Sequence, residues 1–152
     1  MTLQPLTQAW LDQARALEQR CFDDSWSESL WQLYLPQGCS YLLCDDNSRL
    51  LAFALCHRVL DEAELLRIAV APECRQQGLG RMLLQQTLVN LSEQGVTRLL
   101  LEVRASNVAA IALYQCCELQ QDAIRKGYYE TAVSGVREDA CLFSRTLGSQ
   151  PS

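Results

Sequence analysis

One short segment constrains the fold of this chain more than any other. Residues 75–81 read RQQGLGR, directly after IAVAPEC and directly before MLLQQTLVNL. The first run favours a strand and the second has helical spacing, so the segment predicts a glycine-rich turn that opens a helix. The first N–H groups of a helix have no partner within it, and glycines let an anion approach them closely. The turn is therefore either a phosphate site or a plain tight turn, and its residues leave both interpretations open.

The chain has 152 residues, enough for one domain with its own hydrophobic core. We place that domain at residues 1–147 and treat 148–152 as a short C-terminal tail. A net charge of −5 argues against binding to nucleic acid or an anionic membrane. The sequence has neither a signal-peptide pattern nor an apolar run long enough to cross a bilayer. We expect a cytoplasmic monomer with no nucleic-acid or membrane partner.

Eight cysteines are present, together with a single histidine, His57, and no pair has C-x-x-C spacing. Structural zinc sites use ligands at short, paired spacing, so we expect no metal site. We interpret the cysteines as small buried hydrophobic residues of a protein in a reducing compartment. A disulfide between the neighbours Cys116 and Cys117 would be strained, which makes a redox switch there a minor hypothesis.

Hydrophobic periodicity predicts an α+β domain in which strands form first a meander and then a β-α-β-α-β half. The expected elements are two short helices within 6–34, strands at 39–45, 50–60 and 62–70, a helix from 79 to about 94, a strand at 98–103, a helix at 108–117 and two strands within 119–147. A capping box at Ser25–Glu28 and the cap residue Asn107 would begin two of the helices. In the strand 62–70, strict alternation places Ile68 on one face and Leu65, Arg67 and Ala69 on the other.

Two common phosphate-binding motifs do not fit the glycine turn. A Walker loop requires Lys-Ser or Lys-Thr, which the chain lacks, and a dinucleotide fingerprint requires a third glycine. Arg75–Gly80 instead matches (Gln/Arg)-x-x-Gly-x-(Gly/Ala), the signature that follows an apolar strand in the Gcn5-related N-acetyltransferases (GNAT). Asn107–Tyr114, within LEVRASNVAAIALY, resembles the Asn-x-x-Ala-x-x-Leu-Tyr segment of the same family.

The resemblance spans roughly residues 15–145, and DSWSESLW and GYYE…GVREDA extend it toward one subgroup. Members of that subgroup acetylate the N-terminal alanine of a small-subunit ribosomal protein. The resemblance implies a GNAT fold with a mixed, mostly antiparallel sheet of about six to seven strands flanked by about four helices. It also implies acetyl-CoA as co-substrate and the N-terminal peptide of a ribosomal protein as acceptor.

The same resemblance implies a set of site residues. The backbone of Ile68, Ala69 and Val70 would pair with the pantetheine arm of acetyl-CoA, and Asn107 would contact the cofactor across the cleft. Glu102 would be the general base and Tyr114 the general acid. The pyrophosphate would bind the N–H groups of Gln76, Gln77, Gly78, Leu79, Gly80 and Arg81.

Several alternatives remain open at this stage. Glu102 can instead pair with an arginine such as Arg104, and Tyr114 can simply fill the core. An α-amine titrates near pH 8, about two units below lysine, which favours it as acceptor. A small-molecule amine is a second acceptor class, and a non-catalytic acyl-CoA-binding domain is a third possibility.

Two further features have a functional and a structural interpretation. The acidic run Asp61, Glu62 and Glu64 either attracts a basic peptide or is a solvated surface. Tyr128 and Tyr129 either line a peptide site or pack a strand pair.

The sequence departs from the family pattern after Tyr114. The family usually has a left-handed glycine at the end of this helix, and this chain has Glu118. A non-glycine residue in that conformation costs about 1–2 kcal/mol, which leaves the end of the helix in question.

Overall fold

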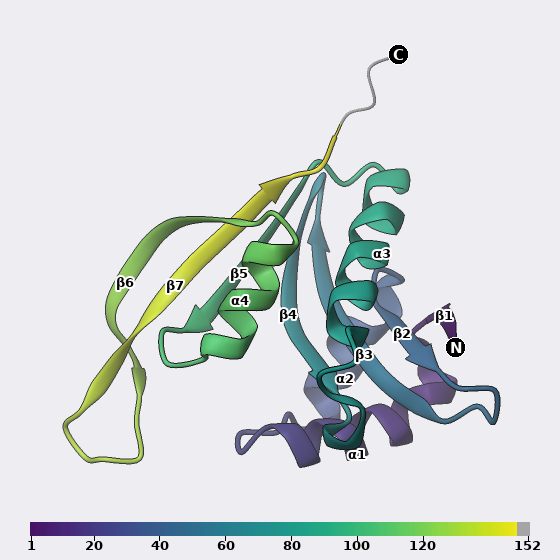
Figure 1. The fold of residues 1–152 in the computed structure, drawn as a ribbon, viewed down its shortest axis with the longest axis horizontal. Coiled ribbons are helices and arrows are strands. Elements are labelled where there is room, and N and C mark those ends of the chain that lie inside the picture. The colour runs from purple at the N-terminus through teal and green to yellow at the C-terminus, as the bar shows by residue number, and fades with distance from the viewer. Residues whose placement is uncertain (149–152) are drawn as a thin grey trace.

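The sheet of this protein divides into two parts that meet at only three residue pairs. In the computed structural model, which describes residues 1–148, the seven strands have the order β1-β2-β3-β4-β5-β7-β6. Strand β4 runs parallel to β5 and pairs with it only where Glu62–Glu64 meets Arg98–Leu100. Beyond these pairs the two strands separate, and α4 lies in front of the gap (Figure 1). All other neighbouring strands are antiparallel.

The elements in chain order are β1 (Thr2–Pro5), η1 (Gln8–Trp10), α1 (Leu11–Cys21), α2 (Glu28–Tyr34), η2 (Leu35–Gln37), β2 (Tyr41–Cys44), β3 (Leu50–Val59), β4 (Glu62–Val70), η3 (Pro72–Cys74), α3 (Leu79–Glu93), β5 (Arg98–Arg104), α4 (Val108–Cys116), β6 (Gln120–Glu130) and β7 (Arg137–Thr146). The predicted mixed, mostly antiparallel α+β architecture is confirmed. Strand β1 was not expected from the sequence; it extends the sheet beyond β2. The predicted tail, 148–152, lies outside the described residues apart from Gly148.

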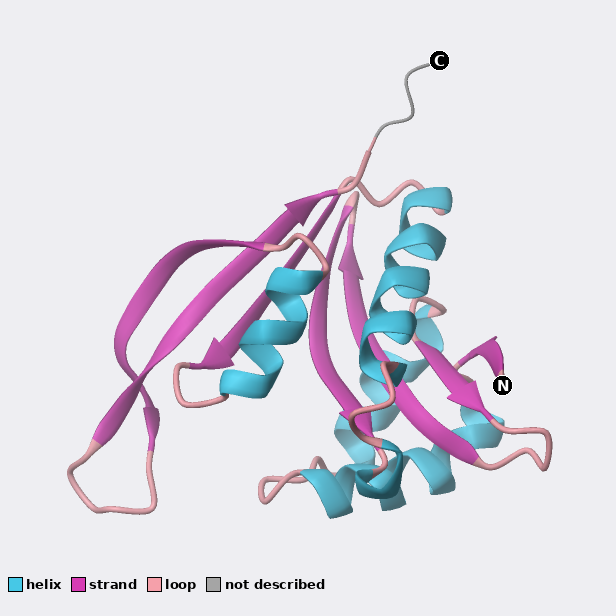
Figure 2. Ribbon diagram, viewed as in Figure 1, coloured by secondary structure: helices cyan, strands magenta, loops and turns pink. Residues whose placement is uncertain are grey.

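Helices cover both faces of the sheet and enclose a separate hydrophobic core on each (Figure 2). Helices α3 and α4 cover one face, where Leu83, Leu99 and Phe143 are buried. Helices α1 and α2 cover the other, where Trp31 and Phe53 are completely buried. The core under α3 and α4 contains residues from both parts of the sheet, so it holds together what the strands alone join weakly.

Strand β4 does not alternate strictly, because it contains a β-bulge. Leu65 and Arg67 pair with consecutive residues of β3, which leaves Leu66 as an extra residue between them. Leu65 therefore packs in the core under α3, and so does Ile68, whereas Ala69 packs in the other core. The prediction that Leu65 faces the same way as Ala69 is wrong, because the bulge rotates the strand between them.

The predicted helix starts are confirmed with one correction. The cap of α2 is Ser27, whose hydroxyl accepts from the N–H of Leu30 at 3.4 Å, and not Ser25. Asn107 caps α4, since its Oδ1 accepts from the N–H of Ala110 at 3.2 Å. Helix α3 begins after Gly78, which has a φ of 77°.

Helix α4 ends as a glycine-terminated helix does, although the residue at the critical position is not glycine. Glu118 has a φ of 65°, and its N–H donates to the carbonyl of Gln115 at 3.0 Å. The N–H of buried Leu119 donates to the carbonyl of Tyr114 at 3.0 Å, which completes a Schellman motif. Arg145 holds this end from outside, because it donates to the carbonyl of Cys117 and pairs with the Glu118 carboxylate.

All eight cysteines are free thiols, and five of them are buried. Cys116 and Cys117 form no disulfide. Within residues 1–148, no group of three or more His, Cys, Asp or Glu side chains is arranged to hold a metal ion. No helix in that range has the length and apolar character needed to span a bilayer.

Candidate active site

Two adjoining cavities open where β4 and β5 separate. We call the first, of about 570 Å³, the glycine-turn cavity, because residues of the 75–81 turn line it. The second, of about 320 Å³, is lined by both Glu102 and Tyr114, and we call it the tyrosine cavity. Both share Phe22, Ile68 and Asn107, so a molecule in the first can reach the second.

The glycine-turn cavity gathers most of the residues expected to bind a cofactor. Of the ten predicted residues, only Gln77 is absent from its lining; those present are Ile68, Ala69, Val70, Gln76, Gly78, Leu79, Gly80, Arg81 and Asn107. The first N–H groups of a helix have no acceptor within it. At the start of α3, no side chain of the described residues caps these groups either. Backbone N–H groups at a helix start can form an anion site.

The turn is shaped by two left-handed residues and one arginine. Gln76 and Gly78 have φ values of 63° and 77°, and only the second is a glycine. Arg75 folds back against β4, with its Nε donating to the carbonyl oxygen of Val70 at 3.3 Å. A Cβ atom on Gly80 would lie 3.5 Å from both Val70 and Leu113, so the start of α3 packs closely on β4 and α4.

The edge of β4 that faces β5 forms the floor of this cavity. Pairing with β5 stops at Glu64, so residues 65–70 have no partner strand on that side within the described part of the chain. In an extended strand, alternate N–H and C=O groups point to each side, and those facing the gap are free to bind a ligand. An elongated molecule with amide groups, ending in a phosphate at the turn, fits this arrangement.

Tyr114 combines a core position with a place in the tyrosine cavity. It is 6% exposed, and its ring centroid lies 6.1 Å from that of Phe143. Burial disfavours the charged phenolate and raises the pKa of Tyr114 to about 12. The hydroxyl carries its proton at neutral pH, as that of an ordinary tyrosine does, and a general acid requires that proton.

Glu102 lines the same cavity from β5, and its side chain is 23% exposed. Its ion-pair partner is Arg125 of β6, at 3.4 Å. Glu102 is therefore paired with an arginine, as the alternative interpretation held, but the partner is Arg125 and not Arg104, which pairs with Glu138. The β-bulges in β6 set which of its residues lie opposite β7 and β5, and this register was not readable from the sequence.

The acidic run 61–64 is not gathered at the cleft. The carboxylate of Asp61 accepts from Thr97, and Glu62 pairs with Arg98 at 3.7 Å, both where β4 and β5 are still joined. Glu64 lies further along and is only partly buried. Burial raises the pKa of Glu64, and the negative charge of Glu102 raises it further.

One wall of the tyrosine cavity comes from a segment that sequence reasoning did not assign to a site, and the other holds Tyr129, which the sequence had offered as a peptide-site residue. Phe22, Asp24 and Trp26, between α1 and α2, form one wall, and Tyr129 of β6 stands on the other. Arg104 lies over the Tyr129 ring, 4.4 Å from its centroid. Tyr128 does not line the cavity and is 47% exposed. Asp24 and Trp26 lie in DSWSESLW, which the sequence marked only as part of the family resemblance, since loop residues have no periodicity that would assign them to a cavity.

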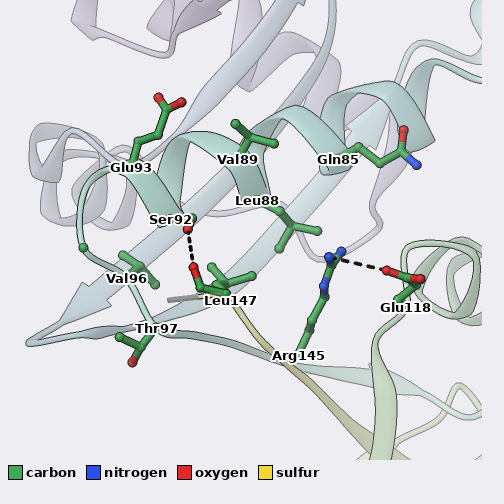
Figure 3. Close-up of a pocket in the computed structure, with 12 residues that line it drawn as sticks. Gln85, Leu88, Val89, Ser92, Glu93, Val96, Thr97, Glu118, Arg145 and Leu147 are labelled. Atoms are coloured by element: carbon green, nitrogen blue, oxygen red, sulfur yellow. Dashed lines mark hydrogen bonds and ion pairs between the residues drawn. The ribbon is translucent and has the colours of Figure 1, made fainter. Parts of the chain in front are cut away.

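A larger cavity, of about 680 Å³, lies at the far end of α3, between that helix and the end of β7 (Figure 3). There Arg145 pairs with Glu118 at 3.4 Å, and Ser92 donates to the carbonyl of Gly148 at 3.3 Å. None of the predicted site residues lines it, so size alone does not identify the active site.

The protein combines parallel strands β4 and β5 that separate, a glycine-rich turn at the resulting cleft and a buried tyrosine. Known proteins share this fold. The profile of the acetyltransferase (GNAT) family matches residues 4–118, and the chain belongs to this family. The chain is 42% identical to the [ribosomal protein bS18]-alanine N-acetyltransferase of Escherichia coli K12, over 94% of this chain and 95% of the relative. It is 43% identical to the protein of the same name from Salmonella typhimurium, with the same coverage.

A solved structure agrees with these sequence matches. The crystal structure of the ribosomal-protein-S18-alanine N-acetyltransferase from Escherichia coli superimposes with a TM-score of 0.86 and 38% identity. The match covers 99% of this chain and 98% of the other. The similarity therefore extends over both parts of the sheet and the cleft between them.

Proposed function

We propose that this protein transfers an acetyl group from acetyl-CoA to the N-terminal α-amine of ribosomal protein bS18, at an alanine. The observation that carries this proposal is the meeting of Glu102 and Tyr114 in one cavity that adjoins the glycine-turn cavity. The near full-length similarity to two bS18-alanine acetyltransferases supports the choice of acceptor.

The glycine-turn cavity is the proposed acetyl-CoA site. Acetyl-CoA, when bound, supplies an acetyl group activated as a thioester. The free edge of Ile68, Ala69 and Val70 binds the pantetheine amides, and Asn107 contacts the cofactor from the start of α4. The N–H groups of residues 76–81 bind the pyrophosphate, favoured by the positive end of the α3 dipole.

Glu102 and Tyr114 move the protons of the reaction. The Glu102 carboxylate accepts a proton from the acceptor ammonium, directly or through a water, which leaves the amine able to attack. The phenol of Tyr114 donates to the sulfur as negative charge grows there. The attacking amine must lose a second proton as the amide forms, and that proton would restore the phenol of Tyr114 after it protonates the sulfur, so that coenzyme A would leave as the thiol. Because a thiol is the stronger acid, with a pKa of about 8.5, these two proton transfers would have to occur together. The transfer is direct, with no acyl-enzyme.

The discriminating experiment offers several acceptors to the purified protein with acetyl-CoA. A peptide with the N-terminal sequence of bS18, the same peptide with a blocked α-amine, and a panel of polyamines and aminoglycosides are compared by mass spectrometry. We expect one added acetyl group on the free peptide only. Turnover of small amines alone would favour the second acceptor class, and acetyl-CoA binding without any turnover would favour a non-catalytic domain.

We also propose that the protein acts as a cytoplasmic monomer, without a nucleic-acid or membrane partner. The net charge of −5 supports the absence of a nucleic-acid or anionic-membrane partner. Sedimentation at working concentration and fractionation of the host cell test these two points.

A further inference from the structure

We propose that Arg67 is a positioning residue for the acceptor peptide: it fixes the segment 22–27 as one wall of the tyrosine cavity. This inference rests on the proposed function, because it assigns that cavity to the acceptor. Arg67 does not act on the reacting atoms in this proposal. It acts through the segment that it holds.

One guanidinium group contacts three residues of the segment. Arg67 Nη2 donates to the carbonyl oxygen of Asp24 at 3.0 Å and lies 3.3 Å from its carboxylate. The guanidinium carbon lies 4.3 Å from the centroid of the Phe22 ring and 5.4 Å from that of Trp26. These same three residues line the tyrosine cavity.

Glu18 holds the arginine and the segment together. Its Oε1 accepts from the backbone N–H of Trp26 and from the indole N–H of Trp31, both at 3.0 Å. Its Oε2 lies 3.3 Å from Arg67 Nε, and the Glu18 and Arg67 side chains are 1% and 10% exposed. A buried carboxylate on α1 thus joins Arg67 of β4 to Trp26 of the segment and to Trp31 of α2.

The bulge at Leu66 makes this arrangement possible. It turns Arg67 toward α1, while its neighbours Leu66 and Ile68 line the tyrosine cavity with it. The position of the wall is therefore tied directly to the strand that forms the cavity floor.

Stability alone does not explain the pair. Burying two charges removes their hydration, and an apolar pair of similar volume is often as stable or more stable. The two groups are also imperfectly aligned, since Glu18 Oε2 and Arg67 Nη1 lack a hydrogen-bond partner among residues 1–148. What the pair does provide is a fixed place for an otherwise irregular segment.

The test uses a double variant, Glu18→Gln with Arg67→Met, because Arg67→Met alone would leave a buried unpaired charge. The introduced amide would retain an oxygen that can accept from Trp26 and Trp31, while the ties to Asp24 and the aromatic rings are lost. We expect KM for the bS18 peptide to rise about tenfold, because binding of the peptide must now also order the segment 22–27. Only Phe22 of the segment lines the glycine-turn cavity, so KM for acetyl-CoA should change by less than about threefold.

The matched control is Glu62→Gln with Arg98→Met, which removes an ion pair between β4 and β5 at the joined end. It should leave both KM values unchanged. An unchanged peptide KM in the Glu18/Arg67 variant would overturn the proposal, and so would an equal rise of both KM values.

A second readout does not depend on turnover. Hydrogen exchange at the Trp26 amide should be faster in the Glu18/Arg67 variant than in the wild type and the control. If the wild type does not acetylate the peptide, the proposed function fails, but this measurement still tests whether Arg67 holds the segment. Unchanged exchange at Trp26 would refute the positioning role.

Discussion

Tyr114 shows how one side chain meets two demands at the residue scale. Its ring belongs to the core between α4 and β7, and its position also borders the tyrosine cavity. The same burial that anchors the ring keeps the proton on the hydroxyl, since the pKa rises to about 12. Core packing and general-acid chemistry are therefore compatible here, although the sequence presented them as alternatives.

Replacement of Tyr114 by Phe isolates the hydroxyl, because the ring still packs on Phe143. We expect kcat to fall by at least about a hundredfold, the usual contribution of a positioned proton donor. The affinity for acetyl-CoA, measured by calorimetry, should stay within twofold. Tyr41→Phe removes another buried phenol, one that accepts from Gln94 away from the cleft, and serves as control. Full activity of Tyr114→Phe would refute the acid assignment.

The same shift predicts a pH dependence of stability. An unfolded tyrosine ionises near pH 10, whereas folded Tyr114 keeps its proton until about 12. Between these values the unfolded state has lost the proton and the native state has not, so stability falls as pH rises. From pH 9 to pH 11 the free energy of unfolding should fall by about 1 kcal/mol because of this group. We would measure the free energy of unfolding with urea at both pH values. Its decrease from pH 9 to pH 11 should be smaller by this amount in Tyr114→Phe than in the wild type.

Glu118 carries backbone strain that a glycine would relieve. Its left-handed conformation costs about 1–2 kcal/mol, whereas its exposed pair with Arg145 is worth less than about 1 kcal/mol. We expect Glu118→Gly to raise the free energy of unfolding by about 0.5–1 kcal/mol. The comparison is Glu118→Ala, which loses the ion pair and keeps the strain, and should not be more stable than the wild type. Denaturant titration of both variants decides the question.

At the scale of elements, the glycine turn combines two glycines with different tasks. Gly78 has the left-handed conformation that starts α3, and a Cβ atom added there would meet no atom within 4 Å. Gly80 is helical and lets α3 approach β4 and α4. The first is required by its dihedral angles, whereas at the second an added methyl group would make only ordinary van der Waals contacts.

Alanine substitutions should therefore act differently at the two positions. Gly78→Ala introduces strain and should lower the free energy of unfolding by about 1 kcal/mol. At Gly80 an added methyl group would meet Val70 and Leu113 at 3.5 Å, an ordinary contact, so Gly80→Ala should be nearly neutral. Thermal unfolding of the two variants checks this order, and a larger loss at Gly80 would contradict it.

At the scale of the whole molecule, local patterns predicted most of the fold. The strand 62–70 and the helix from Leu79 to its end before Gly95 were readable because alternation, helical spacing and glycine punctuation are local signals. The residues expected to line the cleft were found through motifs, and the structure brings Glu102 and Tyr114 to one cavity.

What the sequence did not reveal depends on distant pairing. The bulge at Leu66 exists only in relation to β3, and the partner of Glu102 depends on how β6 pairs with β7. The tie between Glu18 and Arg67 crosses 49 positions from α1 to β4. None of these contacts leaves a periodic trace in the chain.

Because one hydrophobic core contains residues from both parts of the sheet, we expect a single unfolding transition. Strand pairing between the two parts is short, but the core under α3 and α4 contains Leu83 from one part and Leu99 and Phe143 from the other. All three tryptophans lie at or before residue 31, so their fluorescence reports the first part. We expect the denaturation midpoint measured by tryptophan fluorescence to coincide with the midpoint measured by far-ultraviolet circular dichroism, which reports both parts. Two separate midpoints would show that the parts unfold independently.

The separation of β4 from β5 also bears on the solubility of the protein. A free strand edge at the margin of a sheet is a template on which other chains can add strands and aggregate. Here the free edge of β4 lies inside the sheet, between β5 and the helices of one face. To lie along it, the strand of a second protein would have to enter between β4 and β5. The protein thus exposes hydrogen-bonding backbone to its ligand without offering the same backbone to its neighbours.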